Sequence, residues 1–221
     1  MKNTQFRWNI ILWMAFVHVA ALVSLPFVNP TNLVALLVLY PVTAIGVTLG
    51  YHRMMSHKAF KAPKWLERTL MTIATLSVQG GPIEWVGLHR HHHLHSDEDV
   101  DHHNSRKGLW WSHMGWMFQE VPAMAEVPAL TKDMQRDPYY VWLERNFMVP
   151  TLILGTLFYF LGGWSLVGWG IMLRLVVVYH VTWLVNSATH TWGYRRYKTT
   201  DNSRNNWWVG LLAFGEGWHN N

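Results

Sequence analysis

Histidine is concentrated in one short part of the sequence. Residues 89–104 read HRHHHLHSDEDVDHHN, and seven of these sixteen residues are histidine, in a chain with fourteen histidines and no cysteine. Neutral imidazole is the commonest side-chain metal ligand in proteins. On a helix, offsets of three and four residues place His89, His92 and His93 on one face, whereas His91 points elsewhere. The stretch therefore predicts a metal site without thiolate ligands.

Other histidines stand where apolar stretches of the chain end. His52 and His57 follow one such stretch in HRMMSH, His190 follows another in NSATH, and His219 closes the chain in GEGWHNN. If these ends lie on one side of a membrane, their histidines share a depth and can converge. A structural zinc site needs only four ligands, so this many histidines favour two metal ions. A dinuclear iron site can activate O₂ and abstract hydrogen from an unactivated C–H bond.

Four apolar stretches must position these histidines. They cover residues 9–28, 33–51, 149–168 and 169–189, and each has the length of about 20 residues that crosses a bilayer as a helix. Only 14% of all residues are charged, well below the usual share in soluble domains. We expect an all-α, multi-pass membrane protein of one domain, residues 1–221, with four helices in two hairpins.

His18 and His180 each stand alone inside an apolar stretch. A lone histidine in such a place more often hydrogen-bonds between packed helices than binds a metal ion. We expect this packing role for both residues.

The distribution of Lys and Arg predicts the orientation in the membrane. The short connections expected between paired stretches, residues 29–32 and 162–168, carry no charge. Two basic residues, Lys2 and Arg7, precede the first stretch, eleven Lys or Arg lie in 52–148, and four follow the last stretch. Lys and Arg accumulate in cytoplasmic loops. Both termini and a polar cap, residues 52–148 and 190–221, are therefore predicted on the cytoplasmic side. The same bias explains the net charge of +5 without a nucleic-acid partner.

The cap itself is predicted to be helical in part. Residues 64–79 have apolar residues at helical spacing, Gly80-Gly81-Pro82 interrupts them, and a second helix follows over 83–95. Residues 120–138 contain three prolines and are predicted to be loop or short helices. Acidic side chains after the second helix are expected to fix imidazole tautomers, or simply to solvate the cap. These are Asp97, Glu98, Asp99 and Asp101.

The sequence resembles the membrane fatty acyl desaturases over essentially its whole length. HRMMSH is similar to the first histidine box of that family, HxxxxH, and HRHHH to the second, HxxHH. NSATH resembles the segment with an isolated ligand histidine, and GEGWHNN the start of the third box, HNxHH. GGPIEW, HSDEDVDHHNSRKG and WWSHMGW also match, most closely the Δ9-type acyl-CoA or acyl-lipid desaturases. The chain departs from the family at two positions. The family usually has a residue other than histidine at the position of His91, and proline at the position of His102.

The resemblance implies an enzyme with a non-haem diiron centre, Fe²⁺/Fe³⁺, that uses O₂. It would introduce a cis double bond, at Δ9, into a long-chain fatty acyl-CoA or acyl-lipid. Electrons would come from a separate ferredoxin or a cytochrome b5-type donor. The implied iron ligands are His52, His57, His89, His92, His93, His190 and His219, with Asn186 reaching a metal through water.

The resemblance also implies a tunnel for the acyl chain. The expected substrate-binding residues are Tyr40, Ala44, Gln79, Trp85, Thr182, Arg106 and Lys107. Tyr40 and Ala44 are expected at the closed end of the tunnel. Gln79, Trp85 and Thr182 are expected near the bend at the reacting carbons. Arg106 and Lys107 are expected to contact phosphates of CoA or of a lipid headgroup. Ordinary membrane packing, and plain positive charge in cytoplasmic loops, are the alternatives for these residues.

Other functions are compatible with parts of the pattern. A membrane diiron hydroxylase shares the histidine boxes but adds an oxygen atom instead of removing hydrogen. A metal transporter would place its ligands inside the spans, near the midplane, and not at their ends. In the family, the third box supplies two further histidines after the position of Asn221. The chain as written is therefore expected to bind iron poorly, as an inactive truncated relative, unless the natural protein continues.

Overall fold

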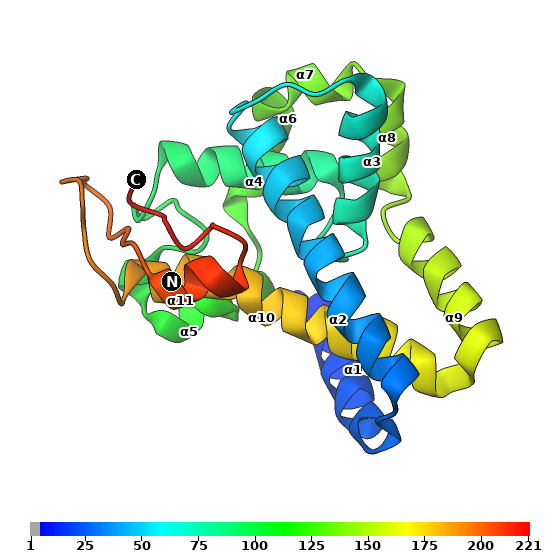
Figure 1. The fold of residues 1–221 in the computed structure, drawn as a ribbon. Helices are drawn as coiled ribbons and strands as arrows, with labels where there is room; N and C mark the ends of the chain where they lie inside the picture. Colours follow the sequence, from blue (N-terminus) through cyan, green and yellow to red (C-terminus); the bar gives the residue numbers. More distant parts are fainter. Residues whose placement is uncertain (1–4) are drawn as a thin grey trace.

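The computed structural model describes residues 5–221 and is built from helices (Figure 1). Among these residues there is no β-strand, only isolated bridges such as the one between Phe6 and Gln119. Lys2, one of the basic residues expected to orient the N-terminus, lies outside the described residues. The predicted all-α class is confirmed.

Three helical stretches in the described residues are long and apolar enough to cross a membrane: Trp8–Phe27, Pro30–Ser56 and Val149–His190. The first combines α1 (Trp8–Ser24) with the 3₁₀ turn η1 (Leu25–Phe27). The second combines α2 (Pro30–Ile45) with the π-helix η2 (Gly46–Ser56). Asn29 caps α2 by accepting a hydrogen bond of 2.9 Å from the backbone N–H of Asn32, which starts the helix immediately after the turn.

The third stretch contains α9 (Val149–Val167), the π-helix η6 (Gly168–Leu173), α10 (Arg174–Ser187) and the 3₁₀ turn η7 (Ala188–His190). Gly163 interrupts it with φ +65°, a left-handed conformation that glycine adopts without steric cost. The chain reverses there, between α9 and α10 (Figure 1). The predicted boundary at residues 168 and 169 is therefore wrong, because both residues continue a helix.

Packing places α10 centrally among the other long helices. η6 and α10 contact both α1 and α2, and η6 also contacts α9 (Figure 1). Val17 of α1 packs with Leu175 and Tyr179 of α10 in a buried apolar cluster. The hydrogen bond of 3.1 Å between the Nε2 atoms of His18 and His180 joins the same two helices. The predicted packing role of these two histidines is confirmed.

The cap consists of two longer helices and several short ones. The predicted helices of the cap are confirmed with shifted ends, as α3 (Lys64–Thr75) and α4 (Pro82–Leu94). The short elements are η3 (Ser105–Lys107), α5 (Leu109–His113), η4 (Gly115–Phe118), η5 (Pro122–Ala125), α6 (Val127–Leu130), α7 (Lys132–Gln135), α8 (Pro138–Arg145) and α11 (Trp207–Leu212). The prolines of residues 120–138 begin three of these short helices, as expected for residues that fit a first helical turn.

The helix α4 is held firmly at its N-terminus. The Glu144 carboxylate accepts hydrogen bonds from the backbone N–H groups of Ile83, at 2.6 Å, and Glu84, at 3.3 Å. A Cβ atom on Gly81 would lie 2.3 Å from that carboxylate, so only glycine fits there. Tyr51 of η2 and Leu143 of α8 belong to one buried cluster beside α4. This packing fixes the helix that carries His89, His91, His92 and His93.

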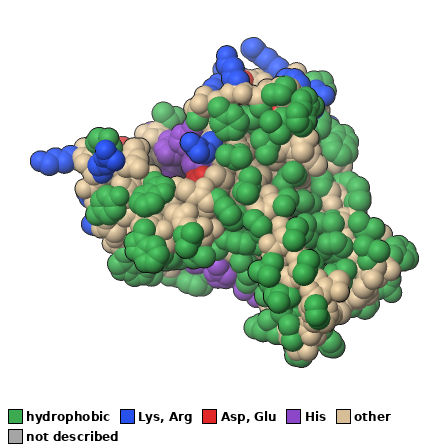
Figure 2. Space-filling model, viewed as in Figure 1, with side chains coloured by type: hydrophobic (Ala, Val, Ile, Leu, Met, Phe, Trp, Pro, Cys, Tyr) green, Lys and Arg blue, Asp and Glu red, His purple; other side chains and the backbone are tan. Residues whose placement is uncertain are grey.

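The surface divides by side-chain type. Hydrophobic side chains cover much of the face formed by α2 and α9, whereas Lys and Arg gather at the edges formed by the cap (Figure 2). Large exposed apolar residues on the long helices include Leu12, Phe16, Leu37 and Phe160. Apolar side chains that face outward on such helices are typical of a lipid-facing surface.

Candidate metal centre and acyl cavity

The first histidine cluster joins the end of η2 to α4. Four histidines each offer one ring nitrogen within 4.8 Å of the others: His52, His57, His89 and His93. The Nε2 atom of His57 lies 2.8 Å from Nε2 of His52 and 3.2 Å from Nε2 of His89. The Nε2 atom of His93 lies 2.9 Å from that of His89. Imidazole nitrogens that share a metal ion at about 2.1 Å lie roughly 3.0–3.4 Å apart, so these four side chains are close to a ligand arrangement.

The π-helix η2 explains how His52 and His57 meet. In an α-helix, with about 3.6 residues per turn, residues five apart lie on different faces. In η2 the backbone N–H of His57 donates to the carbonyl of His52, at 3.0 Å, so the hydrogen bond spans five residues and each turn is wider than in an α-helix. Residues five apart then lie above one another. Their ring centroids are 4.5 Å apart.

The second histidine cluster joins three distant parts of the chain. His92 on α4, His190 at the end of η7 and His219 near the C-terminus each offer a ring nitrogen within 4.8 Å of the others. His92 and His190 are buried, and Nε2 of His190 has no hydrogen-bond partner among the described residues. An unpaired buried nitrogen is costly, and a metal ion would satisfy it. The cluster adjoins the first, since the rings of His93 and His219 are 6.5 Å apart.

Carboxylates orient the imidazoles in both clusters. Nδ1 of His92 and Oδ2 of Asp101 are 2.9 Å apart, and the same distance separates Nδ1 of His190 from Oδ2 of Asp97. Each imidazole donates its Nδ1–H there and leaves the Nε2 lone pair for a metal ion, as in many metal sites. Asp97 and Asp101 therefore lie where the sequence expected acidic residues that fix imidazole tautomers. Glu216, which the sequence did not point to, contacts Nδ1 of His52.

The ionisation of these groups suits metal binding. Burial would raise the pKa of Asp97, but hydrogen bonds from His190, Ser105 and the Asn202 backbone outweigh it and lower that pKa. Burial, together with repulsion from neighbouring imidazoles, lowers the pKa of His57 to about 4 and that of His93 to about 3. Both imidazoles are therefore neutral near pH 7, which is the form that binds metal ions.

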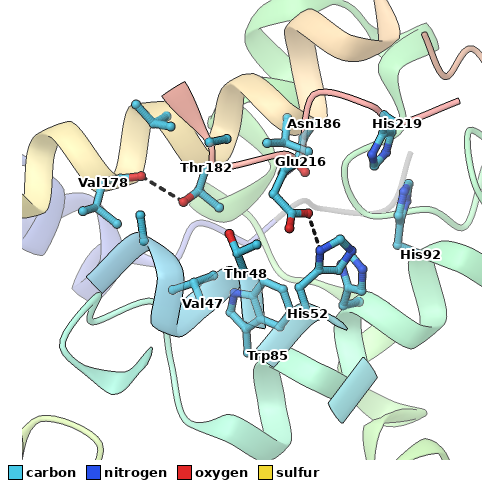
Figure 3. A pocket seen from close by; sticks show the side chains of 15 residues that line it. Val47, Thr48, His52, Trp85, His92, Val178, Thr182, Asn186, Glu216 and His219 are labelled. Atoms are coloured by element: carbon cyan, nitrogen blue, oxygen red, sulfur yellow. Dashed lines mark hydrogen bonds and ion pairs between the residues drawn. The ribbon is translucent and has the colours of Figure 1, made fainter. Parts of the chain in front are cut away.

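A narrow apolar cavity ends at the two clusters. It lies between η2 and α10, has about 580 Å³ of empty space including its opening to solvent, and has apolar walls that include Val47 and Val178. His52, His92 and His219 face it from the other end (Figure 3). A second, larger cavity of about 1500 Å³ continues toward α1. Both cavities are lined by Trp85, His89, Thr182 and Asn186.

Comparison with known proteins shows the family of the chain. The family model for fatty acid desaturases matches residues 29–221. The chain belongs to the fatty acid desaturase family. It is 51% identical to the sn-1 stearoyl-lipid 9-desaturase of Anabaena variabilis, over 98% of this chain and 81% of that protein. The sn-1 stearoyl-lipid 9-desaturase of Synechocystis sp. is 50% identical, over 97% of this chain and 68% of its own length. The sn-2 palmitoyl-lipid 9-desaturase of Nostoc sp. (strain 36) is 44% identical, over 100% of this chain and 79% of its own length.

Several residues predicted to bind substrate in this desaturase do meet at the cavities. The Trp85 indole N–H donates to Oε1 of Gln79 at 3.2 Å, and the Gln79 amide donates to Oγ1 of Thr182 at 3.1 Å. Gln79 lines the larger cavity, and the other two line both. Ala44 lines the narrow cavity. The chain of hydrogen bonds fixes these side chains where the two cavities join.

Other predicted residues lie away from the cavities of the desaturase. The Tyr40 hydroxyl donates to the carbonyl of Leu212 at 2.5 Å, so Tyr40 joins α2 to α11 and does not line either cavity. Arg106 donates to the carbonyl of Thr200 at 3.0 Å. The Lys107 ammonium lies 5.5 Å from the ring centre of Trp111. Arg106 and Lys107 also line neither cavity.

The unusual histidines of this desaturase have different surroundings. His102 is buried next to Trp116, with ring centroids 4.6 Å apart. His103 lies against His92, with ring centroids 4.0 Å apart. His91 points away from both clusters, as its helix position predicts, and its partners are His95 and Glu126. Because His91 does not enter either cluster, the set His89, His92 and His93 stays the candidate from α4.

Proposed function

We propose that the chain catalyses O₂-dependent introduction of a cis double bond, at Δ9, into a long-chain acyl group. The observation that carries this proposal is the narrow apolar cavity that ends at two histidine clusters. An acyl chain in that cavity would lie with a fixed methylene pair beside the clusters. The names of three relatives, all lipid 9-desaturases, support the position of the double bond and the substrate class.

The proposed metal ligands form two groups. His52, His57, His89 and His93 would hold one iron ion, and His92, His190 and His219 the other. Asn186, which lines both cavities, would reach the second ion through water. Two bound iron ions would supply the redox chemistry that activates O₂ and removes two hydrogens from adjacent methylenes. The donor set suits iron, since imidazole is a ligand for iron, copper and zinc.

The protein residues have separate tasks in this proposal. Asp97 and Asp101 keep the Nδ1 protons in place, so that His190 and His92 present Nε2. Trp85, with its partners Gln79 and Thr182, holds the acyl chain at the junction of the two cavities. The apolar walls, which include Val47 and Val178, exclude water from the reacting carbons. Ala44 leaves room for the far part of the chain.

We propose an intact membrane lipid as the acyl carrier, in preference to acyl-CoA. CoA needs cations for its phosphates, and Arg106 and Lys107 lie away from both cavities. The larger cavity includes Arg7, Asn9 and Glu84 among its polar residues, a set suited to an uncharged or singly charged headgroup. A ferredoxin or cytochrome b5-type protein would supply electrons at the cap.

We propose that the chain is one desaturase domain with four membrane crossings, the last two separated at Gly163. The termini and the cap would face the cytoplasm, in line with the Lys and Arg distribution. The chain has no cysteine, so single introduced cysteines report their side directly. Asn29→Cys and Trp164→Cys, the second at an exposed residue next to Gly163, should react with an impermeant thiol reagent from outside the cell, and Ser105→Cys only after lysis. The reverse pattern would refute the orientation.

The reaction is tested by expressing the full-length protein in a host without a 9-desaturase and analysing its lipids by mass spectrometry. The proposal expects a loss of two hydrogens from C16 or C18 acyl groups, with the double bond at Δ9. His93→Ala should abolish the product, whereas Asp99→Asn should retain it. A gain of one oxygen would support the second candidate, a membrane diiron hydroxylase, which the same histidine clusters could serve.

A further inference from the structure

A third group of metal-binding side chains lies on the opposite face of α4. His91 lies in the last turn of that helix, His95 directly follows its end, and Glu126 is the residue before α6. Each of the three offers a ligand atom within 4.8 Å of the others. They share no member with the two clusters of the proposed diiron centre. The rings of His91 and His95 have their centroids 4.9 Å apart.

His91 is buried without the hydrogen bonds that would account for its burial. It is 1% exposed, and its Nδ1 atom has no hydrogen-bond partner among the described residues. Its Nε2 atom lies 3.7 Å from Oε1 of Glu126, beyond hydrogen-bond distance. Two ligands that share a tetrahedral zinc ion at about 2.0–2.1 Å lie roughly 3.3–3.4 Å apart. The separation is therefore closer to that of two ligands of one ion than to that of a hydrogen-bonded pair.

His95 is oriented by its own carboxylate. Nδ1 of His95 and Oε2 of Glu98 are 2.9 Å apart. The imidazole donates its Nδ1–H to Glu98, so its Nε2 lone pair is free for a ligand. The same combination of carboxylate and histidine orients ligands in many metal sites, and it recurs in this protein at His92 and His190.

An ordinary ion pair explains these contacts less well. Nε2 of His91 and Oε1 of Glu126 are 3.7 Å apart, which is too long for the short charge-assisted hydrogen bond of a buried ion pair. His95 and Glu98 are more exposed than His91, which leaves the group open to ions from solvent.

We propose that His91, His95 and Glu126 bind one divalent transition-metal ion, of which Zn²⁺ is the best match, as a site separate from the diiron centre. Two neutral imidazoles and one carboxylate form a common ligand set for zinc. The ion would link the last turn of α4 to the segment that begins α6. This segment already packs closely on α4, where a Cβ on Gly87 would lie 2.7 Å from Val127. The role of the ion is structural.

The test uses the full-length protein in detergent, loaded with iron and then titrated with Zn²⁺. Bound zinc and iron are counted by elemental analysis after removal of free metal, and the unfolding temperature is recorded. We expect one tightly bound zinc ion per chain, with unchanged iron content and a raised unfolding temperature. His95→Gln and Glu126→Gln should each lose that zinc ion and the rise in temperature. Glu120→Gln, an exposed glutamate outside the group, is the matched control and should keep both.

A third substitution tests the orientation of His95. Glu98→Gln should weaken zinc binding by about 10- to 100-fold, as loss of such carboxylates does elsewhere. Equal zinc content in wild type, His95→Gln and Glu126→Gln would overturn the proposal, as would zinc that appears only by displacing iron. Because Glu126 is exposed, its variant should fold even if another does not. Zinc and iron are counted separately, so failure of the diiron proposal would be seen independently.

Discussion

Asp101 offers the sharpest test of how the second histidine cluster is held. Its carboxylate is fully buried and accepts hydrogen bonds from three donors. These are Nδ1 of His92 at 2.9 Å and the backbone N–H groups of Asp97 at 2.9 Å and His103 at 3.3 Å. Burial would raise the pKa of Asp101, but the interaction with His92 outweighs it and lowers that pKa. The group is therefore a carboxylate that carries its charge next to a proposed iron ligand.

Two substitutions should have graded effects. Asp101→Asn can keep its oxygen toward His92 and Asp97 but turns an N–H₂ group toward His103, and it loses the negative charge. We expect iron affinity to fall about tenfold, or about 1.4 kcal/mol. This is the lower end of the roughly 10- to 100-fold loss of metal affinity that follows when such a carboxylate is replaced. Asp101→Ala leaves three donors without an acceptor. We expect a loss near 100-fold in iron affinity, and destabilisation by roughly 3 kcal/mol or more, at about 1–3 kcal/mol for each unpaired donor.

The assay measures bound iron per chain across a series of free iron concentrations, with the unfolding temperature of the metal-free protein alongside. Asp99→Asn is the matched control, because the side chain of Asp99 makes no hydrogen bond among the described residues. Only the backbone carbonyl of Asp99 accepts one, from the Lys107 ammonium at 3.2 Å. It should match wild type in both measurements. A folded Asp101→Ala protein with wild-type iron affinity would refute the reasoning that His92 depends on this carboxylate.

Three further predictions concern the cavity, the pH dependence and the cap. Ala44→Leu should exclude about two methylenes of the acyl chain from the narrow cavity. Each methylene that is no longer buried costs about 0.8 kcal/mol of binding free energy, so the ratio of C16 to C18 products should rise roughly 15-fold in lipid analysis. Burial lowers the pKa of His102 to about 3, below its unfolded value of about 6.5. Between these two pKa values only the unfolded chain binds this proton. The free energy of unfolding therefore falls as the pH drops below about 6.5, by up to about 1.4 kcal/mol per pH unit. The metal-free His102→Gln variant should lose less stability than wild type between about pH 6.5 and 5 in thermal unfolding; an equal loss would contradict this assignment. Arg90 makes two hydrogen bonds to Asp133, at 2.9 and 3.0 Å, and donates to two backbone carbonyls at 2.6 Å. Arg90→Ala should destabilise the protein by about 2 kcal/mol in thermal unfolding, because both carbonyls lose a donor, whereas Arg90→Lys should lose less.

Part of the structure follows from local sequence pattern. The apolar stretches predicted long helices, and the offsets within residues 89–93 predicted which histidines share a face of α4. Both inferences depend on the period of a helix, which acts over neighbouring residues only. The order of the histidine boxes likewise indicated the family, and the comparison bears this out.

Features that depend on exact helix geometry were not predicted. His52 and His57 meet because η2 is a π-helix, and no composition signal distinguishes such a turn from an α-helix. The reversal at Gly163 falls within the expected connection, residues 162–168, but the expected span bounds at residues 168 and 169 lie beyond it, because the apolar residues continue through the turn. The short turn shows in the backbone angles and not in hydropathy.

The partners of the charged groups were decided by the tertiary structure. Asp97 reaches His190, 93 residues away, while Asp101, in the same loop, reaches His92 and Glu98 reaches His95. Sequence alone marked these carboxylates as a group, and it also marked the histidines as metal ligands, because residue type sets what a side chain can bind. Which histidine each carboxylate contacts, and which side chains line the narrow apolar cavity, depend on how α4, α10 and the C-terminal segment pack together.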